Sequence, residues 1–434
     1  MIMASRSHEQ LDILFVSEHA LHPVDQGFSI RGSNMVKAMD AMGVRVAVAS
    51  EQPLPAQASD EIRRLYLDWP EVDDDQTDKF LKGWQGPGYR ARLRIADYQG
   101  RDLERFAGVI SLVEKHQPKT VIGLGQHSTM MLRALKPYTG IRKVWYAADE
   151  LMYFQLSCMR REGLSTLSKR LQMLALYGGL ETFFVRGMDG AIGVAPQEAK
   201  LLKYLAGAKK TTCIRNGVDT GYFAPPRVRP VNKQLVFWGR MDFEPNIDAV
   251  TWFSQHVWPQ LHAKHPDAVL KVVGKNPTEA IQSLDRMDGI EIVGAVPDIR
   301  PYVNDSSATV LPMRCGGGIK NKLLEAAAMG IPIVGSPKAV LGLEARDGKL
   351  PVLTCKTTDQ WITTLGNLWS DTLQSEKLSI ELRLWVLSHH SWPNAARQML
   401  QWLDRLPCAE GHCVRHTPLA YVHATQSSVH KEAA

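Results

Sequence analysis

Short runs of branched apolar residues alternate along the chain with longer amphipathic stretches. In the first half, these runs occupy residues 11–17, 44–50, 120–125, 142–147, 189–195 and 211–215. Continuous apolar runs are typical of strands buried on both faces, because a solvated face would require alternating polar residues. We therefore expect βαβ units, with residues 33–43 and 157–179 among the helices between the strands.

The alternation of apolar runs and amphipathic stretches resumes after an irregular segment in the middle of the chain. Residues 216–234 are rich in proline, glycine and polar side chains without any period, which predicts a linker. The later strand-like runs lie at 235–239, 268–274, 290–294, 308–312 and 331–336, and the helices near 246–263, at 319–329 and onward to about 406. We therefore predict an α/β protein with two Rossmann-like parallel-sheet domains, residues 1–215 and 235–387.

Two segments lack this rhythm. Residues 52–100 combine an acidic cluster with a glycine-containing turn and basic residues, and we expect a surface insertion or a loop-helix region. Residues 407–434 show little periodicity, which predicts a flexible tail. The cysteines and histidines in 408–416 could suggest zinc, but their spacing does not match the paired ligands of zinc sites.

Composition narrows the class of protein. The chain has 434 residues, of which 44% are hydrophobic and 22% charged, as in globular proteins. Lys and Arg total 51 against 45 Asp and Glu, a surplus that predicts no nucleic-acid partner but suits a protein that holds phosphates. Six irregularly spaced cysteines make no disulfide framework, and no apolar run reaches the roughly 18 residues of a membrane span. We expect a cytoplasmic protein.

The strongest candidate site follows the run at 308–312, because parallel sheets bind ligands beyond the carboxyl ends of their strands. Its unobstructed backbone amides belong to Gly316, Gly317 and Gly318. Placed at a helix N-terminus, these amides suit a pyrophosphate. Lys322 and Glu325 share a face of the following helix, so the lysine could bind a phosphate and the carboxylate could accept sugar hydroxyls. Arg240 directly follows the run at 235–239, where it could bind a phosphate or pair with Asp242 or Glu244.

Candidates in the first domain also follow strands. Gly27 lies in the loop 22–33, where glycine permits close approach of a ligand. His127 follows the run at 120–125, and Asp149 follows the run at 142–147. A single residue of this kind could instead cap a helix or belong to the core.

The second half resembles the glycosyltransferases of the GT-B fold, family 4 type. The resemblance rests on FWGRMDFEPNIDAVTWF, on IEIVGAVPDIRPYVNDSSATVLPMRCGGGIKNKLLEAAAMGIPIV, on HSWPNAARQMLQWL and on RNGVDTGYF, and it extends more weakly to residues 11–206. It implies two Rossmann-like domains facing across a cleft, with a C-terminal helix (388–406) that crosses back to the N-terminal domain. It further implies transfer of a sugar from a nucleotide-sugar with retention of configuration, without metal or other cofactor.

The resemblance also implies roles for the candidate residues. The residues that would contact the donor pyrophosphate are Arg240, Gly316, Gly317, Gly318 and Lys322, and Glu325 would hold the ribose hydroxyls. Gly27 would lie near the donor and acceptor, and His127 and Asp149 near the transferred sugar. Gly317 stands where the family has a first glutamate, and Asn246 lies in the region of a family lysine, which Lys322 could replace.

The acceptor would be a glycan or glycolipid such as a lipid-linked surface-polysaccharide precursor. Residues 157–179 carry leucines at helical spacing with Arg160, Arg161, Lys169 and Arg170, which allows either a peripheral contact with the inner face of a membrane or an ordinary core helix. Two other functions stay open. One is a GT-B nucleotide-sugar epimerase, and the other is a non-catalytic nucleotide-sugar-binding or scaffold protein.

Overall fold

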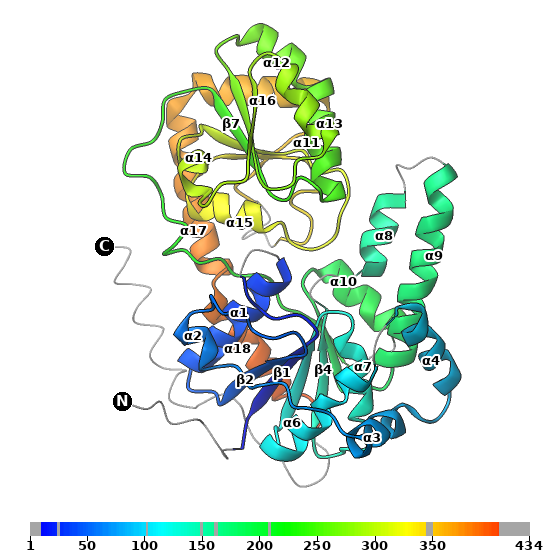
Figure 1. The fold of residues 1–434 in the computed structure, drawn as a ribbon. Helices are drawn as coiled ribbons and strands as arrows, with labels where there is room; N and C mark the ends of the chain where they lie inside the picture. The colour runs from blue at the N-terminus through cyan, green and yellow to red at the C-terminus, as the bar shows by residue number, and fades with distance from the viewer. Residues whose placement is uncertain are drawn as a thin grey trace. The chain divides into compact units, whose positions relative to one another are not determined.

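The computed structural model describes residues 10–23, 27–100, 103–147, 151–159, 164–206, 210–343 and 350–407. The chain forms two compact units (Figure 1). Unit 1 extends to Arg215 and takes up the chain again from Trp392, and unit 2 is Asn216–Ser391. Each unit contains a six-stranded sheet whose paired strands are parallel. The α/β fold class and the two Rossmann-like sheets are therefore confirmed.

The sheet of unit 1 has the strand order β2-β1-β3-β4-β5-β6. Its strands are β1 (Ile13–Ser17), β2 (Val46–Ser50), β3 (Thr120–Leu124), β4 (Arg142–Tyr146), β5 (Gly190–Gly193) and β6 (Thr211–Cys213). Its α-helices are α1 (Gly27–Ala41), α2 (Asp60–Arg63), α3 (Asp74–Trp84), α4 (Tyr89–Tyr98), α5 (Leu103–Phe106), α6 (Gly108–His116), α7 (Ser128–Ala134), α8 (Leu151–Met159), α9 (Leu164–Leu180), α10 (Pro196–Leu201) and α18 (Trp392–Leu403). Two π-helical turns, η1 (Glu181–Val185) and η2 (Leu202–Ala206), continue α9 and α10.

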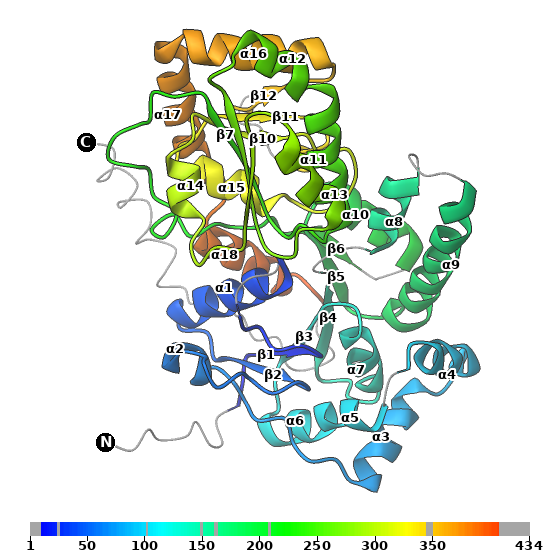
Figure 2. The same ribbon diagram turned by 45° about the horizontal axis from the view of Figure 1, so that its top comes forward.

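Successive residues of β1 are buried on opposite faces of this sheet. Ile13 and Phe15 pack in the cluster that contains residues of α1 and α18, whereas Leu14 and Val16 pack with α6 and α7. Figures 1 and 2 show the two helix layers on either side of the strands. The alternation follows from the pleat of a strand and explains why each strand reads as a continuous apolar run.

The C-terminal helix packs on unit 1, as predicted, but its bounds are narrower than 388–406. Helix α18 spans Trp392–Leu403, and residues 388–389 belong to the preceding helix. Its buried side chains include Trp392, Ala396, Met399, Leu400 and Leu403, the five apolar positions that recur every three or four residues in the sequence. One face of α18 is thus part of the core of unit 1.

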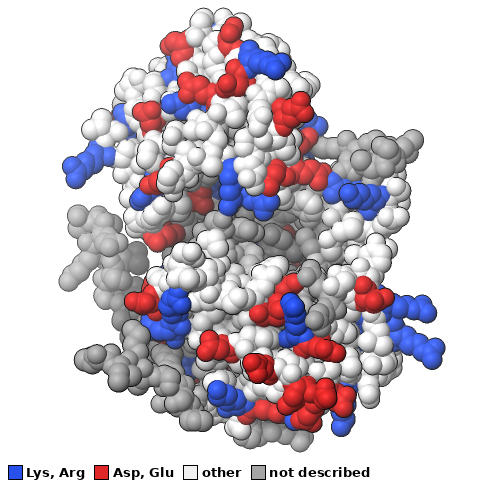
Figure 3. All heavy atoms as spheres, viewed as in Figure 1, with Lys and Arg blue, Asp and Glu red and all other residues white. Residues whose placement is uncertain are grey.

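Residues 52–100 form a loop-helix region, one of the two alternatives left by the sequence, and part of it is buried. Phe80 and Trp84 of α3 are fully buried in the same cluster as Leu14 and Val16. Asp73 caps α3 by accepting a hydrogen bond from the backbone N–H of Gln76, whose side chain bonds back to the Asp73 N–H. The acidic cluster therefore starts a helix, and Figure 3 shows acidic side chains gathered over this end of unit 1.

The sheet of unit 2 has the order β12-β11-β10-β7-β8-β9. Its strands are β7 (Gln234–Trp238), β8 (Val269–Val273), β9 (Ile290–Gly294), β10 (Ala308–Leu311), β11 (Ile333–Gly335) and β12 (Leu353–Thr354). Its helices are α11 (Glu244–His256), α12 (Trp258–Lys264), α13 (Glu279–Gln282), the 3-10 helix η3 (Ser283–Arg286), α14 (Arg300–Asn304), α15 (Asn321–Ala328), α16 (Thr358–Ser370) and α17 (Thr372–His389). The short strand β12 is absent from the sequence prediction because its two residues are not buried.

The segment predicted as a linker, residues 216–234, packs against the rest of unit 2 and is hydrogen-bonded to it. It contains neither helix nor strand before β7 begins at Gln234. Arg229 nevertheless donates hydrogen bonds to the carbonyl oxygen of Gly330 (2.8 Å) and to the Ser379 hydroxyl, and Val218 is buried in the core. This irregular segment is therefore held by side-chain contacts that its composition does not reveal.

Candidate functional site

Each sheet has one point where the order of its strands reverses. In unit 2 the chain starts at β7, builds outward through β8 and β9, then returns to place β10 on the other side of β7. In unit 1 the reversal lies between β1 and β3. Open α/β sheets bind ligands beyond the carboxyl ends of the strands at such points. The loops after β7 and β10, and those after β1 and β3, are therefore the places to examine.

The amino group of Lys322 lies at the carboxyl end of β7. It donates a hydrogen bond to Asn246 Oδ1 (2.8 Å) and stands over the ring of Phe237, 4.1 Å from its centroid. Asn246 Nδ2 in turn donates to the carbonyl oxygen of Arg240 (2.8 Å). A Cβ at Gly239 would come within 3.0 Å of Lys322 Nζ, so glycine leaves the space that the lysine occupies. Lys322, on α15, is thus fixed beside the loop after β7.

Burial shifts the pKa of Lys322 toward neutral pH. The pKa of Lys322 is lowered to about 7, first by desolvation and then by the nearby charge of Lys320, while Glu325 acts in the opposite direction. The amino group can therefore gain or lose its proton near neutral pH. A diphosphate beside it would favour the charged form and would be bound in return.

Glu325 receives a hydrogen bond from a residue that the sequence analysis did not single out. Trp238 Nε1 donates to Glu325 Oε2 at 2.9 Å. Burial raises the pKa of Glu325, although the bond from Trp238 opposes that rise. Trp238 is the last residue of β7 and immediately precedes Gly239 and Arg240, so its place at the strand end was the available signal.

Arg240 forms an ion pair with Asp242, which the sequence left open as the alternative to phosphate binding. Its Nε and Nη2 atoms contact the two carboxylate oxygens of Asp242, both at 3.0 Å. Asn276 donates a further hydrogen bond to Asp242 (3.1 Å). The bonds from Arg240 and Asn276 lower the pKa of Asp242 to about 2. A phosphate would therefore have to share or displace this carboxylate to reach Arg240.

The three glycines lie in a loop ahead of the helix, which corrects the prediction that they form its N-terminus. Helix α15 begins only at Asn321. Gly316 and Gly318 have φ values of 97° and 66°, which favour glycine, and Gly317 accepts a hydrogen bond from Lys320 Nζ at 2.5 Å. In Figure 3, Lys and Arg side chains gather at the end of unit 2 where Figure 1 shows α15. The loop thus brings Lys320 and partly accessible glycine backbone to the β7–β10 reversal.

In unit 1, His127 contacts a carboxylate that the sequence analysis missed. His127 Nδ1 shares a hydrogen bond with Glu18 Oε2, and Glu18 is buried. Glu18 directly follows β1 and His127 precedes α7 after β3, so the bond spans the reversal of this sheet. If Nδ1 carries the proton, the contact leaves Nε2 of the imidazole for a ligand.

The remaining unit 1 candidates have different outcomes. Gly27 is exposed and begins α1, so the loop predicted over 22–33 is helical from residue 27 onward. Asp149 lies outside the residues that the structure describes. Within the described residues, no group of three or more His, Cys, Asp or Glu side chains is placed to hold a metal ion.

The fold is shared with solved glycosyltransferase structures. Sucrose-phosphate synthase from Thermosynechococcus elongatus is similar with a TM-score of 0.65 and 16% identity, over 91% of this chain and 99% of that one. Anabaena Alr3699/HepE in complex with UDP gives a TM-score of 0.60 and 13% identity, over 91% and 100%. WaaG, a glycosyltransferase involved in lipopolysaccharide biosynthesis, gives 0.58 and 14%, over 89% and 99%. These similarities show that the chain has the GT-B fold.

A family match adds the activity class to the fold. Residues 232–371 match the family described as glycosyl transferases group 1. This range contains Arg240, the glycine loop, Lys322 and Glu325. No curated protein matches the chain. Unit 2 thus carries a group 1 glycosyl transferase domain, and the chain is a glycosyltransferase.

Replacing Glu325 by glutamine should weaken donor binding without unfolding unit 2. A neutral amide is a poorer acceptor for ribose hydroxyls, while its oxygen can still accept the bond from Trp238 Nε1. Titration of a nucleoside diphosphate into Glu325→Gln should show roughly a tenfold loss of affinity. A collapse of the melting temperature instead would make Glu325 a structural residue.

Proposed function

We propose that this glycosyltransferase takes its sugar from a nucleoside-diphosphate sugar and transfers it with retention of configuration, without a metal ion. The observation that carries the proposal is Lys322, held by Asn246 beside Gly239 at the strand reversal of unit 2. This arrangement offers a desolvated ammonium group where an α/β sheet binds its ligand. The solved HepE structures contain UDP, UDP with glucose, or UDP-glucose, which supports a uridine nucleotide as the first donor to test.

The proposed chemistry requires charge stabilisation rather than a strong nucleophile. The bond between the sugar anomeric carbon and the diphosphate oxygen breaks, and the acceptor oxygen forms its bond on the same face. The departing phosphate oxygen takes the proton of the acceptor hydroxyl. Lys322 and Arg240 would stabilise the negative charge that develops on the diphosphate, the kind of electrostatic contribution that dominates many enzymes. We assign the Glu18–His127 pair to sugar or acceptor hydroxyls.

One assay separates this proposal from the two other functions. The protein is incubated with UDP-glucose or other nucleotide-sugars, with and without candidate glycan and glycolipid acceptors, and released nucleoside diphosphate is measured. We expect release that depends on the acceptor, and a product with the anomeric configuration of the donor. Conversion of the donor to its epimer would identify an epimerase, and binding without turnover across the acceptor panel would favour a scaffold.

Donor binding should be accompanied by proton uptake near neutral pH. The pKa of Lys322 is about 7 in the free protein, and a bound diphosphate raises it because the ammonium gains an anionic partner. Between pH 7 and the higher pKa of the complex, binding therefore takes up protons, and affinity falls as pH rises. Calorimetry in buffers of different ionisation enthalpy measures this uptake. Uptake that persists in Lys322→Met would contradict the assignment.

We also propose that the acceptor side of unit 1 touches an anionic membrane surface. The helix pair α8 and α9 stands out from the body of unit 1 (Figures 1 and 2). Leu156 on α8 and Leu171 on α9 are 43% and 51% exposed, and Lys169 is exposed near Leu171. Among the described residues, no helix combines the length and apolarity that crossing a bilayer requires.

Exposed leucines beside a cation suit binding at the lipid interface. Leu171→Asp should therefore reduce sedimentation with phosphatidylglycerol vesicles, while Leu373→Asp, an exposed leucine on α17, should not. Equal sedimentation of both variants, or none by the wild-type protein, would overturn this contact.

A further inference from the structure

A cavity of about 870 Å³ lies in unit 1, away from the strand reversal of that unit. Its lining includes Lys119, Arg142 and Asp189, which stand at or directly before the first residues of β3, β4 and β5. Glu18 and His127 follow β1 and β3 at the opposite, carboxyl edge of the same sheet. The cavity thus opens at the amino edge of the sheet, opposite the edge where an α/β sheet binds its substrate.

Cations outnumber anions in the lining of this cavity. The basic residues are Lys119, Arg133, Lys136, Arg142, Lys143 and Arg186, and the acidic residues are Glu114 and Asp189. Arg133, Arg142 and Lys143 are at least partly buried, so their charges are screened less than they would be on an open surface. The excess of positive charge therefore favours an anion inside.

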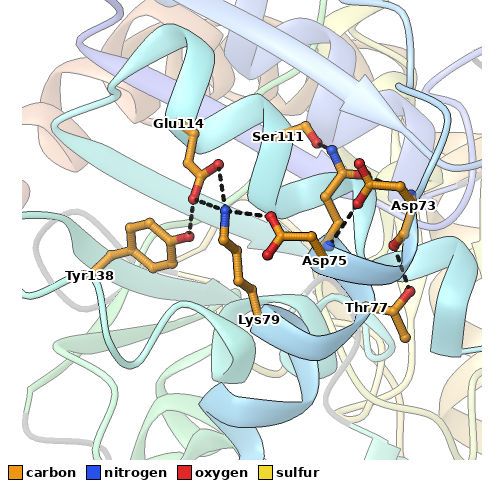
Figure 4. A network of polar contacts seen from close by, with 8 residues as sticks. Asp73, Asp75, Thr77, Lys79, Ser111, Glu114 and Tyr138 are labelled. Carbon is orange, nitrogen blue, oxygen red and sulfur yellow. Dashed lines mark hydrogen bonds and ion pairs between the residues drawn. The ribbon is translucent and has the colours of Figure 1, made fainter.

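Both carboxylates of the lining are engaged by their own partners. Figure 4 shows Glu114 between Tyr138, whose hydroxyl donates to Glu114 Oε1 (2.7 Å), and Lys79, whose Nζ lies 3.3 Å from the same oxygen. Lys79 also pairs with Asp75 (2.8 Å) on its own helix, so the Lys79–Glu114 contact links α3 to α6. Asp189 Oδ2 accepts a hydrogen bond from the backbone N–H of Lys143 (2.9 Å). Neither carboxylate is therefore simply available to neutralise the remaining cations.

Three of the cations have no acidic partner in the described part of the chain. For the side chains of Arg133, Lys136 and Arg186, the described residues supply neither a hydrogen-bond acceptor nor an ion pair. The Nε atom of Arg133 is buried without an acceptor, and the like charge of Arg92 lies near enough to act on it. Burial lowers the pKa of Arg133. A desolvated guanidinium without a counter-charge is costly, and a bound anion would offset that cost.

Part of the cavity wall is apolar. It is formed by Val113, Leu132, Ile141, Phe184 and Met188. A volume of this size is within the range of small-molecule sites, which combine mostly apolar walls with a few placed polar groups. A small inorganic ion alone would leave most of this wall uncovered.

We propose that the cavity is a second binding site, for a small amphiphilic anion with one phosphate, sulfonate or carboxylate group on an apolar body. Arg133, Lys136 and Arg186 would hold the anionic group, and the apolar wall would cover the body. The site is distinct from the donor site of unit 2 and does not depend on the proposed function.

The test compares two probes that share an apolar body and differ in charge. 1-Anilinonaphthalene-8-sulfonate carries the anionic group, and N-phenyl-1-naphthylamine lacks it. Fluorescence titrations use the full chain and the variants Lys136→Met and Arg186→Met, whose side chains are exposed at the rim and whose replacement spares the core. Lys115→Met is the matched control, because Lys115 is an exposed lysine on α6 that does not line the cavity.

We expect the sulfonate to bind at one saturable site, with affinity about tenfold lower in each rim variant and unchanged in Lys115→Met. The neutral probe should bind the wild type and rim variants equally. Equal affinity of the sulfonate for wild-type and rim variants would overturn the proposal. Displacement of the sulfonate by a saturating nucleoside diphosphate would overturn it too, since the probe would then occupy the donor site.

Discussion

Replacing Lys322 by alanine should weaken the binding of a nucleoside diphosphate by roughly 10- to 150-fold, the effect of losing one charged hydrogen bond. Binding of the corresponding nucleoside, which has no phosphate, should change little. The reason is the position of Nζ, which stands beside Gly239 at the end of β7 and is held there by Asn246. Calorimetric titration at acidic pH, which favours the charged form of Lys322, measures both affinities.

Lys264→Ala is the control for this experiment. Lys264 is exposed at the end of α12, which precedes β8 and therefore lies at the amino edge of the same sheet. Its removal subtracts the same charge from unit 2 without touching the β7–β10 reversal, so diphosphate affinity should be unchanged. If Lys322→Ala lowers nucleoside and diphosphate affinity equally, or if Lys264→Ala has the same effect, Lys322 does not bind the phosphates.

Truncation after Ser391 should unfold unit 1 while leaving unit 2 folded. The cut removes α18, whose large buried side chains include Trp392, Met399, Leu400 and Leu403. Each contributes about 1.5–3 kcal/mol by burial, so the helix supplies on the order of 6–12 kcal/mol. That is comparable to the whole stability of a typical domain, about 5–15 kcal/mol. Hydrogen exchange should show lost amide protection in β1, β2 and β3.

Truncation after Pro407 is the matched control, because it removes no described residue of the unit 1 core. Protection in β1–β3 should be close to that of the full chain. The strands β7 and β8 of unit 2 should stay protected in both truncated proteins. If the cut after Ser391 leaves protection in β1–β3 unchanged, α18 does not stabilise unit 1.

The sheets could be predicted from the sequence because the strands carry their own signal. Ile13–Ser17 and Thr120–Leu124 are buried at every position, so they stand out as apolar runs without any knowledge of their neighbours. Helix bounds were less predictable. The segment near 246–263 is two helices, α11 and α12, which meet at Val257 ahead of a proline. The residues at which a helix begins and ends depend on capping and packing as much as on the spacing of its apolar residues.

The partners of the site residues could not be predicted, because they come from distant parts of the chain. Asn246 and Lys322 are 76 positions apart, Trp238 and Glu325 are 87 apart, and Glu18 and His127 are 109 apart. The sequence indicated Lys322 and Glu325 through the helix that follows the glycine loop, and His127 through its place after a buried strand. The contact partner of each residue depends on the strand order, which brings together loops that lie far apart in the sequence.

The most direct test of the central claim is a hydrogen-exchange footprint of the full chain with a saturating nucleoside diphosphate. The claim is that unit 2 binds the donor at the β7–β10 reversal. We predict increased amide protection in peptides that cover residues 238–246 and 312–325, the loops that carry Arg240, the three glycines and Lys322, with little change in β8, β9 or α16. Protection confined to other segments, or no protection under conditions where calorimetry shows binding, would contradict this account of the donor site.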